Sequence, residues 1–387
     1  MQILKLHNRR DMWLYILFLG RFGYFCVKVE QLERIIICVT NDLSADQRVH
    51  KTALTLKNRL GKDVWVIGRK RKNSPEITRP YTTRRFSLPV NKGPLFYAFY
   101  NFRLLLFLLN HRYTEILSND LDTLPAARVA AGLKRVKLFY DSHELFTEVP
   151  ELINRPRVQN IWSWLERRCV KRVDRFYTVC KPIAEIYEKQ YNKKVEVIRN
   201  VPLYRPKHET EKYDKPTLIY QGALNIGRGI ELMIETMELL PRFQLIICGR
   251  GDVEDELQHK ASKQKSKNIH FKGHVDFEMM QTITSKAHIG LSWEENMGLN
   301  YYYALPNKIF DYIQARIPVL VADLPGMKSI VEQYGVGEVL EERQPEKIAR
   351  QIVRIFEKRH TFGTALENAA GELNWNKEEQ KLIDIFI

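Results

Sequence analysis

The sequence predicts an α/β protein with two Rossmann-like domains that face each other across a ligand cleft. Three observations lead to this fold class. The 387 residues exceed what one hydrophobic core usually holds. Short apolar runs alternate with longer amphipathic segments, which is typical of βαβ units in a doubly wound parallel sheet. The alternation stops once, at a polar stretch with three prolines, and then starts again.

The first domain is expected over residues 34–201. Its short apolar runs are rich in Val, Ile, Leu and aromatic residues, as in strands that are buried on both faces. The predicted strands are 34–40, 63–69, 114–120, 136–141, 175–180 and 195–200.

The linker is predicted over residues 202–216, and the second domain over residues 217–370. The strands expected in this domain are 217–222, 243–249, 268–273, 288–293 and 317–323. Ligands of such sheets bind outside the carboxyl ends of the strands, so the cleft between the two domains is the expected site.

Residues 1–33 form an N-terminal extension ahead of the first domain. Its apolar run, residues 12–27, is interrupted by Arg21 and two glycines, and it is shorter than the roughly 20 residues that span a bilayer. Two interpretations stay open: a segment that touches a membrane, and a simple extension.

Positive charge is concentrated in the first half of the chain. Residues 1–200 contain 37 Lys and Arg against 19 Asp and Glu, whereas the remainder has a net charge of −3. An excess of positive charge in one half of the chain favours an anionic partner, such as a phosphorylated substrate, nucleic acid or an acidic membrane. The chain has neither a DNA-reading helix nor an aromatic–basic module of the usual kinds, so nucleic acid is not the expected partner.

The five cysteines are scattered and form no CxxC pair. This pattern favours a reducing compartment, without a disulfide framework or a zinc site, and therefore a cytoplasmic location. The apolar segment 93–109, with the basic run 167–172, allows a peripheral position at the inner face of the plasma membrane. A buried helix is the alternative interpretation of segment 93–109.

A glycine-rich turn joins strand 217–222 to the next amphipathic helix. The sequence "YQGALNIGRGIELM" offers backbone N–H groups, a helix N-terminus and the guanidinium of Arg228. Together these groups can cradle a phosphate. The alternative is that the glycines serve the backbone geometry alone.

A second cation lies near the start of a predicted helix. Pro306 is well placed to begin this helix, and Lys308 falls in its first turn, where a cation opposes the helix dipole. Asp311 follows three residues later, on the same face. Lys308 for a diphosphate and Asp311 for ribose hydroxyls would suit a sugar nucleotide. A local Lys308–Asp311 ion pair is the alternative.

Polar residues also follow the strands of the first domain. His143 comes just after strand 136–141, which indicates either a catalytic group or a helix start capped by Asp141 or Ser142. Asp120 and Asp122 have a spacing that can chelate a metal–diphosphate, but N-capping explains them as well, so no metal site is predicted. Glu254 replaces the third glycine of a dinucleotide motif, which argues against NAD.

These motifs resemble the retaining glycosyltransferases of family 4, also called glycosyl transferases group 1, which have the GT-B architecture. The resemblance rests on "NDLSADQRVHK", "SNDLDTLPAA", "YDSHELFTEVPEL", "VIRNVP", "YQGALNIGRGIELMIE", "GLNYYYALPNKIFDYIQARIPVLV" and "LNWNKEEQKL". It implies sugar transfer from a nucleoside diphosphate sugar to a glycan or lipid-linked acceptor in cell-surface polysaccharide or glycolipid synthesis. No cofactor or metal is implied, and residues 371–387 should form a helix that returns to the first domain.

The resemblance also implies roles for individual residues. The expected catalytic group consists of His143, Arg228, Lys308 and Glu295. Donor-binding positions are expected at Gly222, Gly227, Gly249, Gly273, His274, Val275, Gly298, Leu299, Asn300 and Asp311. Acceptor-side positions are expected at Asn41, Asp42, Arg48, Asp120 and Glu144.

The chain departs from the family pattern in two places. Ala223 stands where an arginine is common, so that Lys308 would supply the second phosphate contact. Tyr303 occupies the place of a glutamate, which leaves the sugar-facing carboxylate open between Glu294, Glu295 and neither. Two alternatives to a transferase therefore stay open: a sugar-nucleotide 2-epimerase of the same architecture, and a sugar-nucleotide-binding protein that has lost catalysis.

Overall fold

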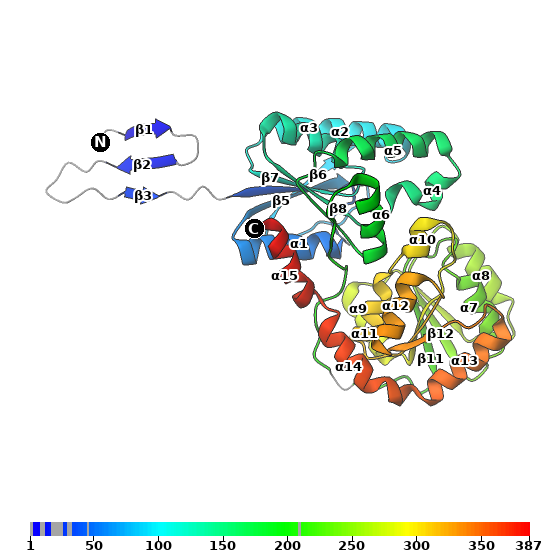
Figure 1. The fold of residues 1–387 in the computed structure, drawn as a ribbon. Coiled ribbons are helices and arrows are strands. Elements are labelled where there is room, and N and C mark those ends of the chain that lie inside the picture. Colours follow the sequence, from blue (N-terminus) through cyan, green and yellow to red (C-terminus); the bar gives the residue numbers. More distant parts are fainter. Residues whose placement is uncertain (1–2, 8–11, 17–25, 29–32, 45, 208–209) are drawn as a thin grey trace.

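The computed structural model describes residues 3–7, 12–16, 26–28, 33–44, 46–207 and 210–387 (Figure 1). Three short strands near the N-terminus, β1 (Ile3–His7), β2 (Met12–Ile16) and β3 (Cys26–Lys28), pair in antiparallel fashion. The predicted membrane contact of the extension 1–33 depends on side chains outside the described residues.

The N-terminal domain is built on a seven-stranded sheet in the order β10-β9-β8-β7-β4-β5-β6, with every pair parallel. The strands are β4 (Arg34–Cys38), β5 (Asp63–Lys70), β6 (Thr82–Ser87), β7 (Glu115–Asn119), β8 (Lys137–Ser142), β9 (Arg175–Thr178) and β10 (Glu196–Val197). The helices are α1 (Gln47–Leu60), α2 (Gly93–Asn110), α3 (Leu124–Lys134), α4 (Pro150–Ile153), α5 (Pro156–Val170) and α6 (Lys181–Tyr191), with the 3-10 turn η1 (Phe146–Glu148).

The C-terminal domain is built on a six-stranded sheet in the order β13-β12-β11-β14-β15-β16, also parallel throughout. Its strands are β11 (Thr217–Gln221), β12 (Gln244–Cys248), β13 (Ile269–Gly273), β14 (Ile289–Ser292), β15 (Val319–Val321) and β16 (Gly337–Val339). Its helices are α7 (Ile230–Met237), α8 (Glu254–Ser262), α9 (Phe277–Lys286), α10 (Leu299–Tyr303), α11 (Asn307–Gln314), α12 (Pro325–Tyr334), α13 (Pro345–Glu357) and α14 (Gly363–Glu372), with the turn η2 (Arg359–Phe362).

The central strands have apolar side chains on both faces because helices cover both sides of each sheet. Strands β7 and β11 are buried along their whole length. The predicted fold class, two Rossmann-like α/β domains with parallel sheets, is confirmed. Two strands at sheet edges, β6 and β16, were not predicted.

The last helix, α15 (Trp375–Phe386), crosses from the C-terminal domain to pack on α1 (Figure 1). The ring of Phe386 stacks on Phe139 of β8 with 4.1 Å between centroids. The indole N–H of Trp375 donates to Thr55 Oγ1 at 3.2 Å. Helix α15 therefore completes the core of the N-terminal domain, whereas Leu373, just before it, packs in the core of the C-terminal domain.

Segment 93–109 folds as part of α2, which has one face in the core of the N-terminal domain. Within the described part of the chain, no helix has both the length and the apolar character that crossing a membrane requires.

Candidate active site

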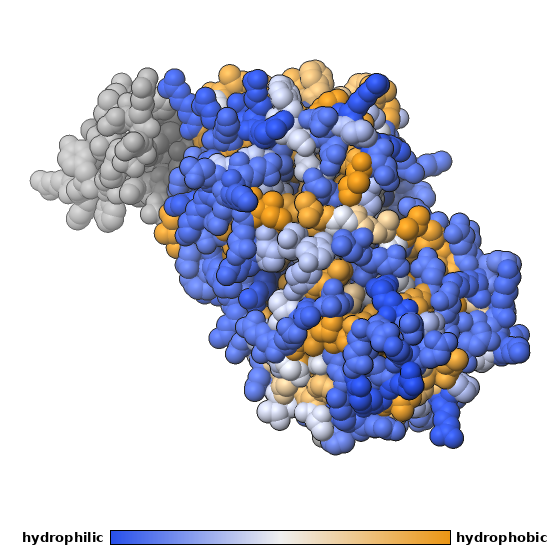
Figure 2. Space-filling view, turned by 45° about the vertical axis from the view of Figure 1, so that its right-hand side comes forward, coloured by the Kyte–Doolittle hydropathy of each residue, from blue (hydrophilic) through white to orange (hydrophobic). Residues whose placement is uncertain are grey.

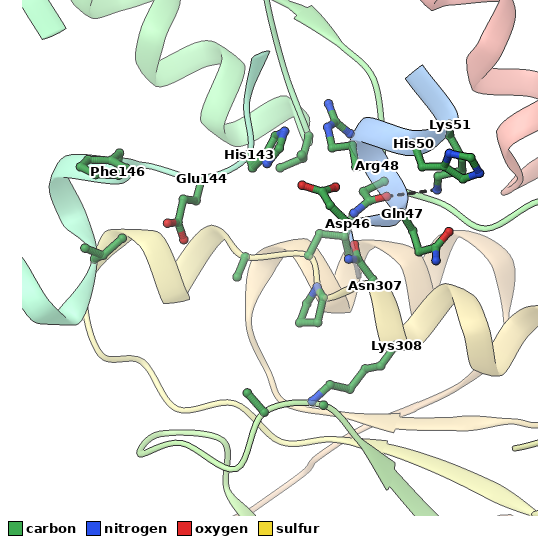
Figure 3. A pocket seen from close by; sticks show the side chains of 18 of the residues that line it. Asp46, Gln47, Arg48, His50, Lys51, His143, Glu144, Phe146, Asn307 and Lys308 are labelled. Atoms are coloured by element: carbon green, nitrogen blue, oxygen red, sulfur yellow. Dashed lines mark hydrogen bonds between the residues drawn. The ribbon is translucent and has the colours of Figure 1, made fainter. Parts of the chain in front are cut away.

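A cleft of about 2270 Å³ separates the two domains at the carboxyl ends of both sheets. The N-terminal wall comes from the start of α1, the loop after β8, and helices α2 and α5. The opposite wall comes from the turn between β11 and α7, the loop before α9, and helices α10 and α11. Figure 3 shows His143 and Glu144 on the first wall and Asn307 and Lys308 on the second.

Two cations on the C-terminal wall share one buried carboxylate. Lys308 Nζ donates to Glu294 Oε1 at 2.8 Å, and Arg228 Nη1 lies 3.8 Å from the same oxygen. Ser292 Oγ donates to the other oxygen of Glu294 at 2.7 Å. Burial opposes ionisation of Glu294, but Lys308 and Arg228 hold its pKa below the ordinary value. Lys308 and Arg228 line the cleft whereas Glu294 lies behind them, only 1 % exposed.

This arrangement presents excess positive charge to a ligand. Two cations and one carboxylate leave a net charge of one positive unit, held in place by the Lys308–Glu294 hydrogen bond and the Arg228–Glu294 ion pair. Lys308 Nζ also lies 4.0 Å from the centre of the Tyr220 ring. The predicted local ion pair between Lys308 and Asp311 is replaced by the Lys308–Glu294 pair, which joins α11 to the end of β14.

Close backbone contact shapes the turn after β11. Gly222 lines the cleft with φ of 137°, and a Cβ added to Gly249 would lie 1.8 Å from the Gly222 carbonyl oxygen. A side chain at Gly249 would therefore push the turn apart. Gly227 has φ of 79°, and its carbonyl accepts from the N–H of Glu295 at 2.8 Å. Gly227 and Gly249 thus support the turn from behind, since neither lines the cleft.

Asp311 lies further along the same wall. It is half-buried, lines the cleft and accepts a hydrogen bond from Gln221 Nε2 at 2.7 Å. Burial raises the pKa of Asp311 to about 6, against the opposing effect of Arg205 and Lys51. The predicted donor-binding residues His274 and Val275 also line the cleft, whereas Gly273 does not.

Glu295, predicted as catalytic, lies outside the cleft lining. Its side chain is 48 % exposed and lies 3.4 Å from Arg343 Nη2. Glu294 is the carboxylate beside Lys308, but it too is hidden from the cleft. The position of Lys308 in the first turn of a helix signals a nearby anion, but the sequence does not identify Glu294 as that anion.

Residues around Gly298 join the domains. The side chain of Asn300 accepts from the Leu145 N–H and donates to Glu144 Oε2, both at 3.0 Å. A Cβ on Gly298 would lie 2.4 Å from Ile153 Cδ1 of the other domain. Asn300 and Glu144 line the cleft, while Gly298 and Leu299 do not. The predicted donor positions 298–300 therefore also form an interdomain contact.

His143 lies between two carboxylates at the end of β8. Its Nδ1 is 3.1 Å from Asp120 Oδ2 and its Nε2 is 3.2 Å from Asp141 Oδ2. Burial opposes protonation, but Asp120 and Asp141 raise the pKa of His143 well above its ordinary value. A carboxylate lies within hydrogen-bond distance of each ring nitrogen, which favours the imidazolium that donates from both. It supplies positive charge to the cleft and has no lone pair for a base.

Arg48 completes this cluster from α1. It donates from Nε and Nη2 to the two oxygens of Asp141 at 2.8 and 2.7 Å, and from Nη1 to the Ile198 carbonyl at 2.9 Å. Burial opposes ionisation of Asp141, but Arg48 and His143 lower its pKa to about 2. Arg48 and His143 line the cleft, whereas Asp120 does not.

The remaining predicted positions support the wall. Asn41 donates to Asp46, and Asp42 accepts from the N–H of Ser44 at 3.1 Å. Asp46 in turn caps α1 through the N–H of Val49 at 2.9 Å. Neither Asn41 nor Asp42 lines the cleft.

Asp120 and Asp122, whose spacing could suit a metal–diphosphate, contact different residues. Asp120 contacts His143, whereas Asp122 accepts from Thr40 Oγ1. Among the residues that the structure describes, no group of three or more His, Cys, Asp and Glu side chains is placed to hold a metal.

The two parallel-sheet domains, which face each other across a cationic cleft, have the GT-B architecture. Residues 204–372 match the family model "Glycosyl transferases group 1", and residues 47–201 match "Glycosyltransferase Family 4". The two matches take in most of both domains, and the chain belongs to this family. A search of curated protein sequences finds no match.

Solved glycosyltransferase structures share the fold. WaaG, "a glycosyltransferase involved in lipopolysaccharide biosynthesis", has a TM-score of 0.70 and 14% identity over 91% of this chain and 99% of its own. Sucrose-phosphate synthase from Thermosynechococcus elongatus has a TM-score of 0.69 and 17% identity over 92% and 98%. HepE from Anabaena, in complex with UDP and glucose, has a TM-score of 0.69 and 12% identity over 92% and 99%.

Replacing Arg48 with alanine is expected to destabilise the fold strongly. The change leaves Asp141 buried without its main partner, which costs about 3–5 kcal/mol of unfolding free energy. Urea unfolding measures the loss, and Arg59→Ala is the control because its ion pair with Glu379 is more exposed and worth at most about 1 kcal/mol. Equal losses in both variants would contradict this account of the Arg48–Asp141 pair.

Proposed function

We propose that this protein transfers a sugar, with retention of anomeric configuration, from a nucleoside diphosphate sugar to an acceptor hydroxyl. The observation that carries the proposal is the pair of cations, Arg228 and Lys308, fixed by Glu294 beside the glycine-rich turn. Charged hydrogen-bond donors in a fixed geometry match the diphosphate group of a nucleoside diphosphate sugar. HepE, of the same fold, is a structure with bound UDP and glucose.

The chemistry follows from where charge develops. The bond between the anomeric carbon and the diphosphate oxygen breaks, and the acceptor oxygen forms the new bond to the same carbon. Arg228 and Lys308 stabilise the negative charge that grows on the departing diphosphate. Fixed cations do this without a metal or a cofactor, so activity is expected to persist in EDTA.

The proton of the acceptor hydroxyl needs a base other than His143, which is already protonated. Retention places the acceptor on the face that the diphosphate leaves, and a departing phosphate oxygen can take the proton there. The positive charge of His143 on the opposite wall then stabilises the leaving diphosphate further. Closure of the domains over the donor would exclude water and limit hydrolysis.

The acceptor is proposed to be a glycan or a lipid-linked sugar bound by the N-terminal domain, in the synthesis of cell-surface polysaccharide or glycolipid. The four buried cysteines among the described residues are all unpaired thiols, which supports a reducing, cytoplasmic setting. The basic first half supports contact of the protein with an anionic membrane.

A thermal-shift screen with UDP, GDP, ADP and their common sugars tests the donor class. Binding stabilises the native state by mass action, so the matching nucleotide should raise the melting temperature as its concentration passes the dissociation constant. No shift with any nucleotide would argue against the proposed function. Release of nucleoside diphosphate from the bound donor separates a transferase from a binder without catalysis, and conversion of the sugar without acceptor would indicate an epimerase.

Nucleotide affinity is expected to depend on pH through Asp311. Burial raises the pKa of Asp311 to about 6, so its carboxylate, the acceptor proposed for the ribose hydroxyls, becomes protonated as the pH falls through about 6. Affinity should weaken over this range more in the wild type than in Asp311→Asn. Calorimetric titrations at several pH values measure the nucleotide affinity of both proteins. Protonation of the phosphate itself affects both proteins equally, so the difference between them reports on Asp311. The same slope in both would contradict this role of Asp311.

A further inference from the structure

Helix α2 has apolar side chains on its outer side as well as in the core. Its inner side packs Tyr100 and Leu104 into the N-terminal core. Its outer side carries a stripe at helical spacing: Leu95, Phe99, Phe102 and Leu106. Phe102 is 63 % exposed. A surface helix normally presents polar side chains to water, so packing within the chain does not account for this stripe.

Helices α3 and α5 extend the apolar surface. Leu133 of α3 is 67 % exposed, and Trp164 of α5 is 49 % exposed. Helix α3 packs beside both α2 and α5, and the three form one layer on the outer side of the N-terminal sheet (Figure 1). Figure 2 shows apolar side chains along the upper edge of the molecule, where this layer lies. A surface of this kind marks an interaction site.

Positive charge predominates in this layer. The three helices contain six basic residues: Arg103, Arg128, Lys134, Arg157, Arg167 and Arg168. Their one acidic residue, Glu166, is buried and accepts from Tyr191 OH at 2.7 Å. The Arg168 guanidinium lies 5.0 Å from the centre of the Trp164 ring. An indole beside an arginine suits the boundary between lipid headgroups and acyl chains.

The same helices line the acceptor side of the cleft. Tyr97 and Ala98 of α2 and Trp162 and Leu165 of α5 face the cavity, and the rings of Tyr97 and Trp162 are 5.1 Å apart. Ile161 both lines the cleft and is exposed at its mouth. The outer apolar surface is therefore continuous with the wall expected to receive the acceptor.

We propose that the outer surface of α2, α3 and α5 docks onto an anionic membrane, so that the apolar wall of the cleft opens toward lipid and the acceptor is lipid-linked. This inference rests on the proposed function for the role of the cleft. Aromatic and aliphatic side chains insert among the lipids while arginines pair with headgroup phosphates. A second copy of the chain fits less well, because a two-fold interface would set the arginines of one copy against those of the other.

Vesicle flotation of the full chain tests this surface. The probes are vesicles of phosphatidylcholine with phosphatidylglycerol, and vesicles of phosphatidylcholine alone. The test variant is Leu106→Gln and the matched control is Leu239→Gln in the C-terminal domain, since the two leucines are 45 % and 46 % exposed. We expect the wild type to bind the anionic vesicles, and salt to weaken this binding. Leu106→Gln should lower the affinity for these vesicles roughly tenfold, the factor expected when one leucine no longer inserts into lipid. Arg167→Glu with Arg168→Glu should abolish the preference for anionic lipid.

Three results would overturn the inference. They are no binding of the wild type to anionic vesicles, equal binding of Leu106→Gln and Leu239→Gln, and a dimer in solution that Leu106→Gln converts to a monomer. The nucleotide thermal shift, measured on the same samples without vesicles, separates the two proposals. A shift without vesicle binding removes only the docking surface, whereas vesicle binding without a shift keeps the docking surface and removes the proposed transferase.

Discussion

Removing the amine of Lys308 is expected to lower kcat/KM by about 10²–10³, the typical effect of losing one charge-stabilising donor. Lys308 Nζ lies at the cleft wall, 2.8 Å from Glu294, and is one of two cations there for a departing diphosphate. Steady-state release of nucleoside diphosphate from the donor measures the effect. The loss should appear in kcat as well as in affinity, because charge on the leaving group grows toward the transition state.

The loss of activity caused by removing the Lys308 amine must be distinguished from a loss caused by unfolding. Lys308→Met leaves the buried Glu294 with the Ser292 hydroxyl and, at 3.8 Å, the Arg228 guanidinium as partners, which is expected to reduce stability by about 3–5 kcal/mol. Lys308→Met combined with Glu294→Gln removes both charges, so it should recover stability while activity stays low. Lys328→Met, which removes an exposed lysine paired with Asp323, is the matched control. Full activity in the double variant would contradict the role of Lys308.

Replacing His143 with glutamine is expected to lower kcat by about 10²–10³ with little change in nucleotide affinity. His143 lies on the wall opposite Lys308, so its positive charge should act on the negative charge that develops on the leaving diphosphate in the transition state more than on the bound nucleotide. Rates at saturating donor, beside nucleotide titrations, separate the two effects. His259→Gln, at an exposed histidine of α8, is the control.

The pH profile distinguishes the charge of His143 from a base. Because Asp120 and Asp141 raise its pKa well above 6.5, the cation persists through neutral pH. Its contribution to stability is complete below the unfolded-state value of about 6.5 and is lost as pH rises through the higher folded-state pKa. The rate should therefore show no rise near pH 6.5 that His143→Gln removes. Such a rise would identify a neutral imidazole acting as a base.

The parallel sheets were predictable because their central strands are apolar on both faces. Runs such as residues 34–40 and 217–222 carry this signal without any tertiary information. The edge strand β6, "TTRRFS", was missed because only Phe86 of its six residues is buried, so that no apolar run marks it in the sequence. Strand β16 has only three residues, too few for a periodic pattern.

The candidate site was predictable only where its residues belong to a motif of neighbouring residues in the sequence. Arg228 and Lys308 were found because a glycine-rich turn and a helix start frame them in the sequence. The partner of Lys308 was not found, because Glu294 is 14 positions away and is brought near by the fold rather than by helical spacing. The Asn300–Glu144 contact joins residues 156 positions apart, so only the packing of the two domains could show it.

The most direct test of the central claim, that the cleft holds a diphosphate between fixed cations, is a calorimetric comparison of nucleoside diphosphate with nucleoside. With the nucleotide from the thermal-shift screen, we predict that the diphosphate binds at least roughly tenfold more tightly than its nucleoside, since one charged hydrogen bond contributes about 1.5–3 kcal/mol. Lys308→Met with Glu294→Gln keeps Arg228 and should reduce this difference by roughly tenfold, the share of one charged hydrogen bond. Equal affinities in the wild type, or a difference that the double variant keeps, would contradict the claim.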